Sequence, residues 1–519
     1  MSWIVLGEEG GLLRLMSTKD VRGMLPKGSF LTIESEGVAH ILRVEDSAQI
    51  EKYRPSPLIA ELDLNPLHQD QQCRNVVFAR RLFDVGAEEA QLVPFIRPQS
   101  KARLSTQEEI DKALGGVKKG PTVFLATVLG GHAQLLKDVD RKPLTVSIPD
   151  EVFFHQLLIC GKTGSGKTVA AKYLAQYFVE VLEGAVLAVN VKDVDFLKMD
   201  NASTPPPDHA AEVQTEWKAL GEEAHGTENL TIYTPPTVIV PPLAGVTDSK
   251  CRVVTLRTDT VDPEAITGLL QGITDAAAQQ LPGIFRYWKQ EVAPQHEHGD
   301  RFTSFVEYFT RQGEAGRGFQ VLNPRGEQTE VTLHRGTFDN IQRNLASAIE
   351  FFDNPDAVAV DQTDILVSGK MSVINVAGDK GIKFGSILLR DILRKVVDCK
   401  RRQESIVPLL IVIDEVHRFY DTGSSRDALG DLDTICRTGR SSQIGVIFIS
   451  QSPNDIPSGL SSVINTSLFF KSDSISAKQL GLRLSPEEME TLRPGFAIAN
   501  IHGVPLVKVV KFPLALGGA

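Results

Sequence analysis

The sequence lacks paired cysteines, long apolar runs and an excess of basic residues. Its five cysteines lie far apart and form no CxxC pair, which argues against a disulfide framework or a zinc site. No apolar stretch approaches the roughly 20 residues that a membrane helix needs. The first residues, Met1–Glu9, carry neither the basic nor the apolar part of a secretory signal. We therefore expect a cytoplasmic protein that works without a membrane.

The charge balance is acidic. With 55 Lys and Arg against 65 Asp and Glu, the formal net charge is −10. The chain as a whole therefore lacks the excess of basic residues that is typical of proteins that bind nucleic acid. A ring or channel can still carry basic loops inside an acidic shell, so the balance does not decide the substrate. At 519 residues the chain is long enough for several domains.

Residues 1–100 contain short apolar stretches separated by Gly, Pro, Asp or Asn. Phe30–Ile33 and Val76–Ala79 are two of them, and this spacing is typical of a small antiparallel barrel or sandwich. Residues 101–149 follow as a connecting segment with strands. We therefore expect a small N-terminal β domain over residues 1–100.

The connecting segment contains both a helix signal and strand signals. A short helix is expected near residues 106–114, with Ser105 or Thr106 as its N-cap. Two strands are expected near 123–129 and 144–148.

From about residue 150 the pattern changes to strand, glycine loop and helix. Leu157–Cys160 is an apolar run too short for a helix, and apolar residues recur at helical spacing beyond the loop. Such units build a mostly parallel sheet with helices on both faces. We assign this core to residues 150–200 and 361–519, and we read residues 201–360 as a helical insertion with helices near 263–280 and 337–352.

The glycine loop has the GxxxxGK[ST] pattern of a phosphate-binding loop and stands between a strand and a helix. Its residues are Gly161, Lys162, Thr163, Gly164, Ser165, Gly166, Lys167 and Thr168. Glycines let successive backbone N–H groups turn toward one anion, and the following helix adds its positive end. Lys167 is expected to reach the β- and γ-phosphates of ATP, and the Thr168 hydroxyl to hold Mg²⁺.

A second part of such a site is a carboxylate at the end of a neighbouring strand. The apolar run Leu409–Ile413 leads into Asp414 and Glu415. We expect Asp414 to bind Mg²⁺ and Glu415 to act as the general base that polarises the attacking water. An adjacent glutamate favours hydrolysis over a kinase or a simple switch.

Two further polar positions lie downstream. The apolar strand Ile444–Ser450 runs directly into Gln451, which can sense the γ-phosphate from a strand tip beside the loop. Arg440 is placed to stabilise transition-state charge, in its own subunit or in a neighbour. The alternative is that Arg437 and Arg440 only favour the C-terminal end of a helix.

The downstream motifs together resemble the HerA branch of the HerA/FtsK ATPases. The segments that carry the resemblance are Val189–Asp193, Asp414–His417, Arg437–Arg440, Ser450–Pro453, Asn465–Lys471 and Leu492–Ala497. One departure is Ser452, where relatives usually have a basic residue. The resemblance covers about 150–200 and 365–515, and the N-terminal segment is compatible with the small barrel of HerA proteins.

The resemblance implies an α/β fold with a RecA-like P-loop core, a small N-terminal β-barrel and a helical insertion. It implies a homo-hexamer that hydrolyses ATP with Mg²⁺ between subunits and moves along double-stranded DNA. Arg440 matches the family's trans-acting arginine, and Gln451 its sensing glutamine. It also implies a separate nuclease or other effector protein, including the antiphage-defence type. An ATP-dependent scaffold that switches an effector and a secretion or conjugation coupling ATPase stay open as alternatives.

Overall fold

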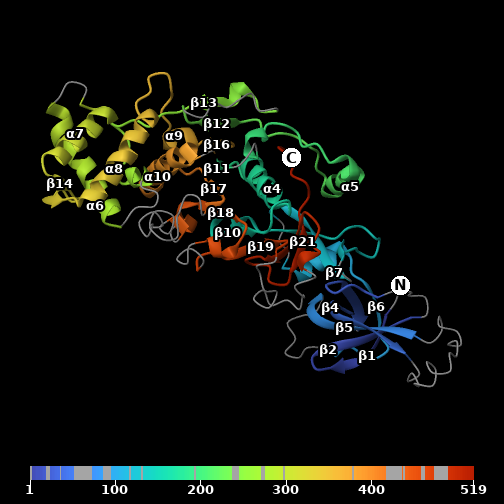
Figure 1. Ribbon diagram of the computed structural model, residues 1–519. Helices are drawn as coiled ribbons and strands as arrows, with labels where there is room; N and C mark the ends of the chain where they lie inside the picture. Colours follow the sequence, from blue (N-terminus) through green and yellow to red (C-terminus); the bar gives the residue numbers. More distant parts are fainter. Residues whose placement is uncertain are drawn as a thin grey trace, which may run out of the picture. The chain divides into compact units, whose positions relative to one another are not determined.

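The protein is described from a computed structural model. The described residues are 3–18, 24–35, 37–51, 73–85, 95–115, 119–129, 132–191, 195–236, 245–269, 275–295, 299–376, 379–416, 435–436, 439–456, 462–472 and 489–519. The chain divides into two compact units (Figure 1). The first comprises Met1–Asp150 and Phe469–Pro513, and the second comprises Glu151–Leu468 and Leu514–Ala519.

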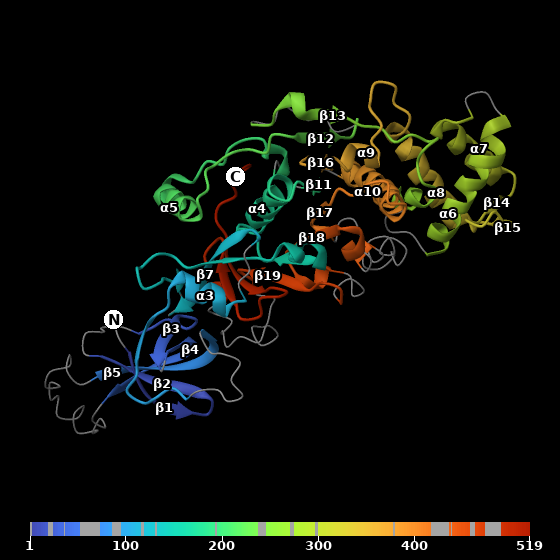
Figure 2. The ribbon, with the colours of Figure 1, turned by 180° about the vertical axis from the view of Figure 1, so that it is seen from behind.

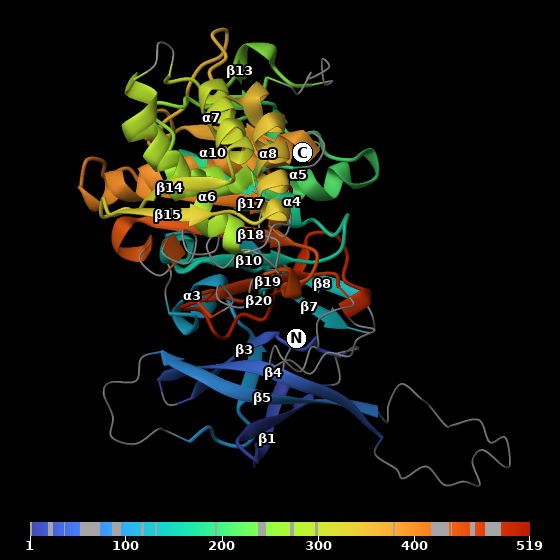
Figure 3. The same cartoon turned by 60° about the vertical axis from the view of Figure 1, so that its left-hand side comes forward.

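The first unit begins with a closed barrel in the order β1-β2-β5-β4-β3-β6 (Figure 3). Every described neighbour pair in it is antiparallel. The strands are β1 (Trp3–Glu9), β2 (Leu12–Ser17), β3 (Phe30–Ser35), β4 (Val38–Glu51), β5 (Cys73–Val85) and β6 (Lys101–Leu104). The last strand comes from the segment expected to be a connection, because barrel closure needs a partner for both β1 and β3.

Apolar side chains from alternate strand positions fill the interior of this barrel. In β2 every second residue is buried, as a strand with one face toward a core requires. Trp3, Leu15 and Val77 are each at most 1% exposed and belong to one apolar cluster inside the barrel.

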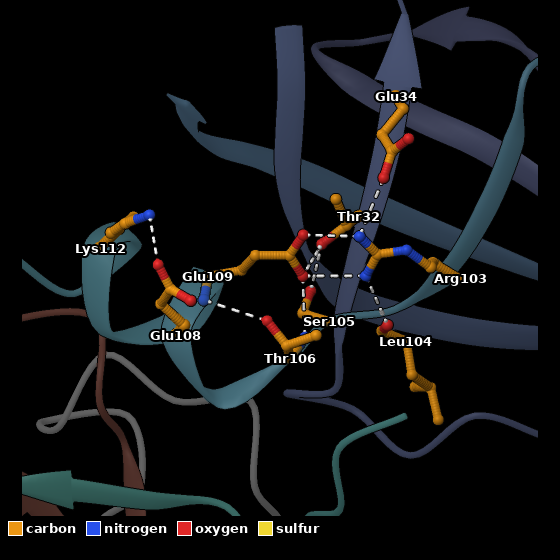
Figure 4. A network of polar contacts seen from close by, with 9 residues as sticks. All are labelled: Thr32, Glu34, Arg103, Leu104, Ser105, Thr106, Glu108, Glu109 and Lys112. Carbon is orange, nitrogen blue, oxygen red and sulfur yellow. Dashed lines mark hydrogen bonds and ion pairs between the residues drawn. The ribbon is translucent and has the colours of Figure 1, made fainter. Parts of the chain in front are cut away.

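The helix expected beside the barrel is confirmed as α3 (Gln107–Ala113), with Thr106 as its N-cap in a capping box. Figure 4 shows how Glu109 of this helix joins it to the barrel. Arg103 binds the Glu109 carboxylate with both ends of its guanidinium, at 2.7 and 2.9 Å, and the Thr32 hydroxyl donates to it at 2.9 Å. Burial alone raises the pKa of Glu109, but these bonds and the Thr106 amide lower it to about 2.

The rest of the first unit is a smaller antiparallel group. β7 (Thr122–Leu129) pairs with β8 (His132–Leu135), β9 (Thr145–Ser147) and β21 (Val509–Lys511), and β21 pairs with β20 (Phe496–Asn500). The two strands expected near 123–129 and 144–148 are confirmed by β7 and β9. A strand β19 (Thr466–Phe470) spans the boundary between the units.

The second unit is built on a parallel sheet in the order β13-β12-β16-β11-β17-β18-β10 (Figures 1 and 2). Its neighbour pairs are all parallel. The strands are β10 (Leu157–Cys160), β11 (Ala185–Asn190), β12 (Leu230–Thr234), β13 (Cys251–Val253), β16 (Met371–Asn375), β17 (Leu409–Asp414) and β18 (Ile444–Ser450). The five strands β10, β11, β16, β17 and β18 are buried along their whole length, as expected for a sheet covered on both faces.

Helices accompany this sheet. α4 (Lys167–Glu180) packs on β10, β11, β17 and β18, and α10 (Asp379–Arg401) follows β16. The shorter ones are α5 (Ala210–Leu220), α9 (Gln362–Ile365), η1 (Asp150–His155), η2 (Phe196–Lys198), η3 (Pro207–His209), η4 (Asp248–Lys250) and η10 (Pro453–Asp455). None of the described helices is long and apolar enough to span a bilayer.

The range 201–360 is not wholly helical. Its strands β12 and β13 lie in the parallel sheet, because Leu230–Thr234 is a short, β-branched and aromatic run that pairs with β16. The helix expected near 263–280 is also wrong in part. Pro263–Leu269 forms the 3-10 segment η5, and a separate helix α6 (Asp275–Tyr287) begins later.

The remaining elements of this range pack together beyond α10 (Figure 2). They are α6, η6 (Trp288–Val292), η7 (Ala293–Gln295), α7 (Phe302–Glu314), the hairpin β14 (Gly318–Leu322) and β15 (Gln328–Thr332), α8 (Arg335–Ala348) and η8 (Ile349–Phe351). α8 confirms the helix expected near 337–352. Aromatic rings make the core, and Phe302 stacks on Phe352 with 3.8 Å between ring centroids.

The last residues, Leu514–Ala519, run along the second unit as an extended strap. Leu516 packs against Trp217 and Val213 of α5, and the Trp217 indole donates to the Leu514 carbonyl at 2.9 Å. Lys172 of α4 donates to the Gly518 carbonyl at 2.7 Å. The strap thus joins α5 to the helix that follows the phosphate loop.

Candidate ATP site

The phosphate loop lies between β10 and α4, as expected. Gly161, Gly164 and Gly166 have φ values of 156°, 77° and 102°. The values at Gly164 and Gly166 are left-handed, which side-chain-bearing residues rarely adopt, so both positions favour glycine. This backbone turns the loop tightly into the first residues of α4, Lys167 and Thr168, where helix N–H groups favour an anion.

The side chains of the loop suit a polyphosphate. Ser165 is 3% exposed, and its hydroxyl has no hydrogen-bond partner among the described residues. Lys167 is 8% exposed, and its ammonium donates to the Lys162 carbonyl at 2.9 Å, which holds the charge over the loop. Burial raises the pKa of the preceding Cys160 thiol to about 12, so this cysteine stays protonated.

The strand order brings the predicted carboxylates to the edge of the sheet that carries this loop. β18 lies between β10 and β17, with Ser450 beside Cys160 and Ile449 beside Asp414. Asp414 and Glu415 are 6% and 5% exposed. Because all three strands are parallel, their carboxyl ends form one row, which is where α/β sheets bind ligands.

Glu415 has an unusual backbone. Its φ is 49°, a left-handed value that side-chain-bearing residues rarely adopt. Its amide donates to the Ile449 carbonyl at 3.0 Å and to Asp414 Oδ1 at 2.9 Å. Gln451 Nε2 donates to Glu415 Oε1 at 2.8 Å, so the predicted base and the predicted sensor are in direct contact. Left-handed conformations of this kind persist where surrounding bonds enforce them and are common at functional sites.

The segment after Gln451 is fixed by its own polar side chains. Ser452 begins η10 as the N-cap of a capping box with Asp455. The Ser450 hydroxyl donates to the Asp455 carboxylate, whose Oδ2 also accepts from the Ser452 amide at 3.0 Å. The serine that replaces the family's basic residue therefore has a structural partner of its own.

Arg440 lies at the other edge of the sheet. It precedes β18, and the carbonyl of the nearby Gln443 accepts from the amide of Leu409, the first residue of β17, at 2.9 Å. Arg440 is exposed and makes no ion pair with any described residue. Residues 441–443 and the seven residues of β18 lie between Arg440 and Gln451, and β18 alone spans about 23 Å at 3.3 Å per residue. Arg437 lies outside the described residues.

Two polar residues at the carboxyl edge were not predicted. Asn190 ends β11 and Asn375 ends β16, in register with each other. Asn190 Nδ2 donates to Asn375 Oδ1 at 3.3 Å, and Asn190 Oδ1 accepts from the Phe196 amide at 3.1 Å. Their signals in the sequence are that an asparagine ends each of two apolar runs and that Asn190 lies within the segment Val189–Asp193.

Comparison with known proteins finds a family model and a relative that match part of this chain. Residues 134–392 match the family model described as the central domain of the helicase HerA. Over 179 residues the chain is 29% identical to a protein of Sulfurisphaera tokodaii named DNA double-strand break repair helicase HerA, an alignment that covers 32% of this chain. The chain spans 36% of the length of that relative.

Solved structures that resemble the chain include VirB4 and the bacterial conjugative coupling protein TrwB. VirB4 of Thermoanaerobacter pseudethanolicus is 15% identical, with a TM-score of 0.43 over 76% of this chain and 96% of VirB4. The bacterial conjugative coupling protein TrwB is 13% identical, with a TM-score of 0.47 over 82% of this chain and 95% of TrwB.

The parallel sheet, the phosphate loop and the adjacent carboxylates Asp414 and Glu415 define a P-loop ATPase. The matched segment includes the phosphate loop, α4, β11 and β16. Within that class, the chain is a HerA-like ATPase of the HerA/FtsK group.

Proposed function

We propose that this chain is a cytoplasmic, ATP-driven motor that moves along double-stranded DNA as a homo-hexamer. Each site is shared, with the phosphate loop from one subunit and an arginine from the next. The observation that carries the proposal is the position of Arg440, exposed at the edge opposite to the phosphate loop. A head-to-tail ring brings these two edges of neighbouring copies together.

Within one subunit, different residues would bind the phosphates, bind the metal and accept a proton. ATP bound with Mg²⁺ supplies the γ-phosphoryl group and the charge that the metal offsets. Lys167 and the loop amides hold the phosphates, while Thr168 and Asp414 hold the metal. Glu415 accepts the proton of the attacking water. Gln451, hydrogen-bonded to Glu415, fixes the direction of its carboxylate and would sense the γ-phosphate.

The substrate of the motor is inferred from the family. The HerA relative is named as a DNA double-strand break repair helicase, which favours duplex DNA as the track. We infer that a separate nuclease or other effector acts on the DNA that the ring moves, including in antiphage defence. Because the net charge is −10, the DNA contacts are expected to be a local cluster of basic residues.

The first test is ATP hydrolysis by the purified full chain with and without duplex DNA. We expect stimulation by duplex DNA and binding that weakens steeply with salt, as phosphate contacts require. Absence of both binding and stimulation in a purified hexamer would overturn the motor. Native mass measurements with ATP and DNA would establish the ring size.

The second test asks whether the site is shared. Lys167→Ala removes the phosphate lysine and should abolish ATP binding, whereas Arg440→Ala should keep binding and lose turnover by roughly 10³-fold or more. Mixing the two inactive variants creates interfaces with an intact loop on one side and an intact arginine on the other. Recovered hydrolysis in the mixture supports the shared site, and normal hydrolysis by Arg440→Ala alone contradicts it.

A further inference from the structure

Gln156, the residue before β10, joins three segments at the amino-terminal edge of the parallel sheet. Its side chain is 1% exposed and uses both ends of its amide. Nε2 donates to the Cys436 carbonyl at 3.2 Å, and Oε1 accepts from the Val446 amide at 2.9 Å. One buried side chain thus connects the strand of the phosphate loop to β18 and to the segment that leads into Arg440.

The backbone of Gln156 shows that this position is enforced. Its φ is 53°, a left-handed value that glutamine rarely adopts. The amide of Thr466 also donates to its carbonyl, at 3.4 Å. Bonds from three sides hold the residue in this conformation.

Residues 439–442, a single helical turn that precedes β18 and carries Arg440, pack directly against this amide. A Cβ on Gly439 would lie 2.3 Å from the Ile444 carbonyl oxygen and 3.4 Å from Gln156 Nε2. The first distance is too short for any side chain, so only glycine fits between the turn and the strand. Arg440 is the next residue, and its direction depends on this contact.

We propose that Gln156 is a positioning residue that fixes the Arg440 turn to the phosphate-loop strand of the same chain. The inference rests on the proposed shared site. β10 leads after Cys160 into the phosphate loop, and β18 ends at the Gln451 sensor. Through Gln156, the arginine offered to one neighbour is held by the two strands that carry the subunit's own nucleotide site.

This arrangement links successive sites of the ring. A shift of β10 or β18 upon nucleotide binding moves the Gln156 amide, and with it the turn that carries Arg440. The occupancy of one site then alters the arginine supplied to the adjacent one. ATP hydrolysis by the full-length protein is therefore expected to depend cooperatively on ATP concentration.

The main experiment is a double-mutant cycle between Gln156→Met and Arg440→Ala. Gln156→Met should lower kcat by roughly 10²-fold, the cost of a misplaced catalytic group, with little change in ATP affinity. Added to Arg440→Ala, it should lower kcat no further, because Gln156 acts through Arg440. Its matched control is Gln403→Met, at another left-handed glutamine (φ 58°) whose side chain is exposed, and this variant should hydrolyse ATP normally.

A second variant covers the case in which Gln156→Met destabilises the fold. In Gln156→Glu the introduced carboxylate still accepts from Val446 but repels the Cys436 carbonyl. When protonated it can donate to that carbonyl again. Activity of this variant, relative to the parent protein at the same pH, should therefore rise as pH falls, while ATP affinity stays constant.

Three results would overturn the positioning role while leaving the shared site intact. One is normal turnover by the single variant Gln156→Met although the single variant Arg440→Ala is inactive. Another is an equal loss caused by Gln156→Met with and without Arg440, which would indicate a general structural effect. The third is a pH profile of Gln156→Glu that follows the parent protein. Normal turnover by Arg440→Ala would instead remove the shared site itself.

Discussion

Gln451 and Glu415 form a hydrogen bond of 2.8 Å between the tips of two neighbouring strands. Glu415 pairs with this amide from a left-handed backbone position, φ 49°, and its side chain is nearly buried. The bond sets the direction of the carboxylate that we assign as the base. If Gln451 acts as the γ-phosphate sensor that we propose, this bond is the contact through which it would control the base.

Glu415→Gln should separate ATP binding from hydrolysis. The amide oxygen of the introduced side chain can still accept from Gln451, so the local geometry is retained while the basic oxygen is lost. We expect kcat to fall by roughly 10²- to 10⁴-fold, the range for loss of a general base, with unchanged ATP affinity. Single-turnover hydrolysis and equilibrium nucleotide binding measure the two effects. Hydrolysis within twofold of the parent protein would exclude Glu415 as the base.

Gly439→Ala should disable the Arg440 turn. The added methyl group meets the Ile444 carbonyl at 2.3 Å, so the turn must move away from Gln156. We expect turnover to fall by roughly 10²-fold while nucleotide binding persists. Gly336→Ala is the control, since a Cβ added at this position in α8 would lie 3.8 Å from the His334 ring, an ordinary contact distance. That change should leave turnover unaltered.

The barrel should lose stability in acid through Glu109. Its folded pKa is about 2, below the ordinary value of 4.5, so its contribution is complete above about pH 4.5 and is lost as pH falls toward 2. Glu109→Gln should cost about 1.5–3 kcal/mol at neutral pH, the worth of a charged hydrogen bond. Hydrogen exchange of the β3 and β6 amides reports on the barrel itself. The difference from the parent protein should shrink between pH 4.5 and pH 3, and a constant difference would exclude the carboxylate as its cause.

The phosphate loop could be read from the sequence because its chemistry is local. Eight consecutive residues and their flanking elements specify it, and the run Leu409–Glu415 is equally self-contained. To predict that the polar residues at the ends of different strands lie close together, one must also know that the strands are parallel. The alternating strand and helix patterns indicate this. These parts of the site therefore follow from short-range patterns.

The remaining parts depend on long-range packing. Gln156 and Cys436 are 280 positions apart, and the amide pair of Asn190 and Asn375 spans 185. No local pattern marks such partners. The edge on which Arg440 lies is set by the hydrogen bond between Gln443 and Leu409, which no local pattern marks. The 263–280 helix failed for a related reason, since an amphipathic pattern does not distinguish a 3-10 segment packed on α10 from an α-helix.

The C-terminal strap is expected to be held in place by Leu516, and its release should alter Lys172 in the helix that follows the phosphate loop. Leu516 is 6% exposed against Trp217, and its carbonyl accepts from the amides of Ser203 and His225 at 2.9 and 3.0 Å. Leu516→Ala leaves a cavity in this small cluster and should release the strap by local unfolding, because the cluster has few other apolar contacts.

Hydrogen exchange at Ser203 and His225 should then accelerate at least tenfold, while amides of the buried strand β17 keep their protection. Lys172 would lose its bond to the Gly518 carbonyl as the strap leaves. Because burial lowers the pKa of Lys172, its exposure should raise that pKa toward the ordinary value, which NMR titration can follow. Ile406→Ala, at a side chain 86% exposed, is the control and should change neither observable. Unchanged exchange at both amides in Leu516→Ala would show that hydrogen bonds hold the strap without the Leu516 side chain.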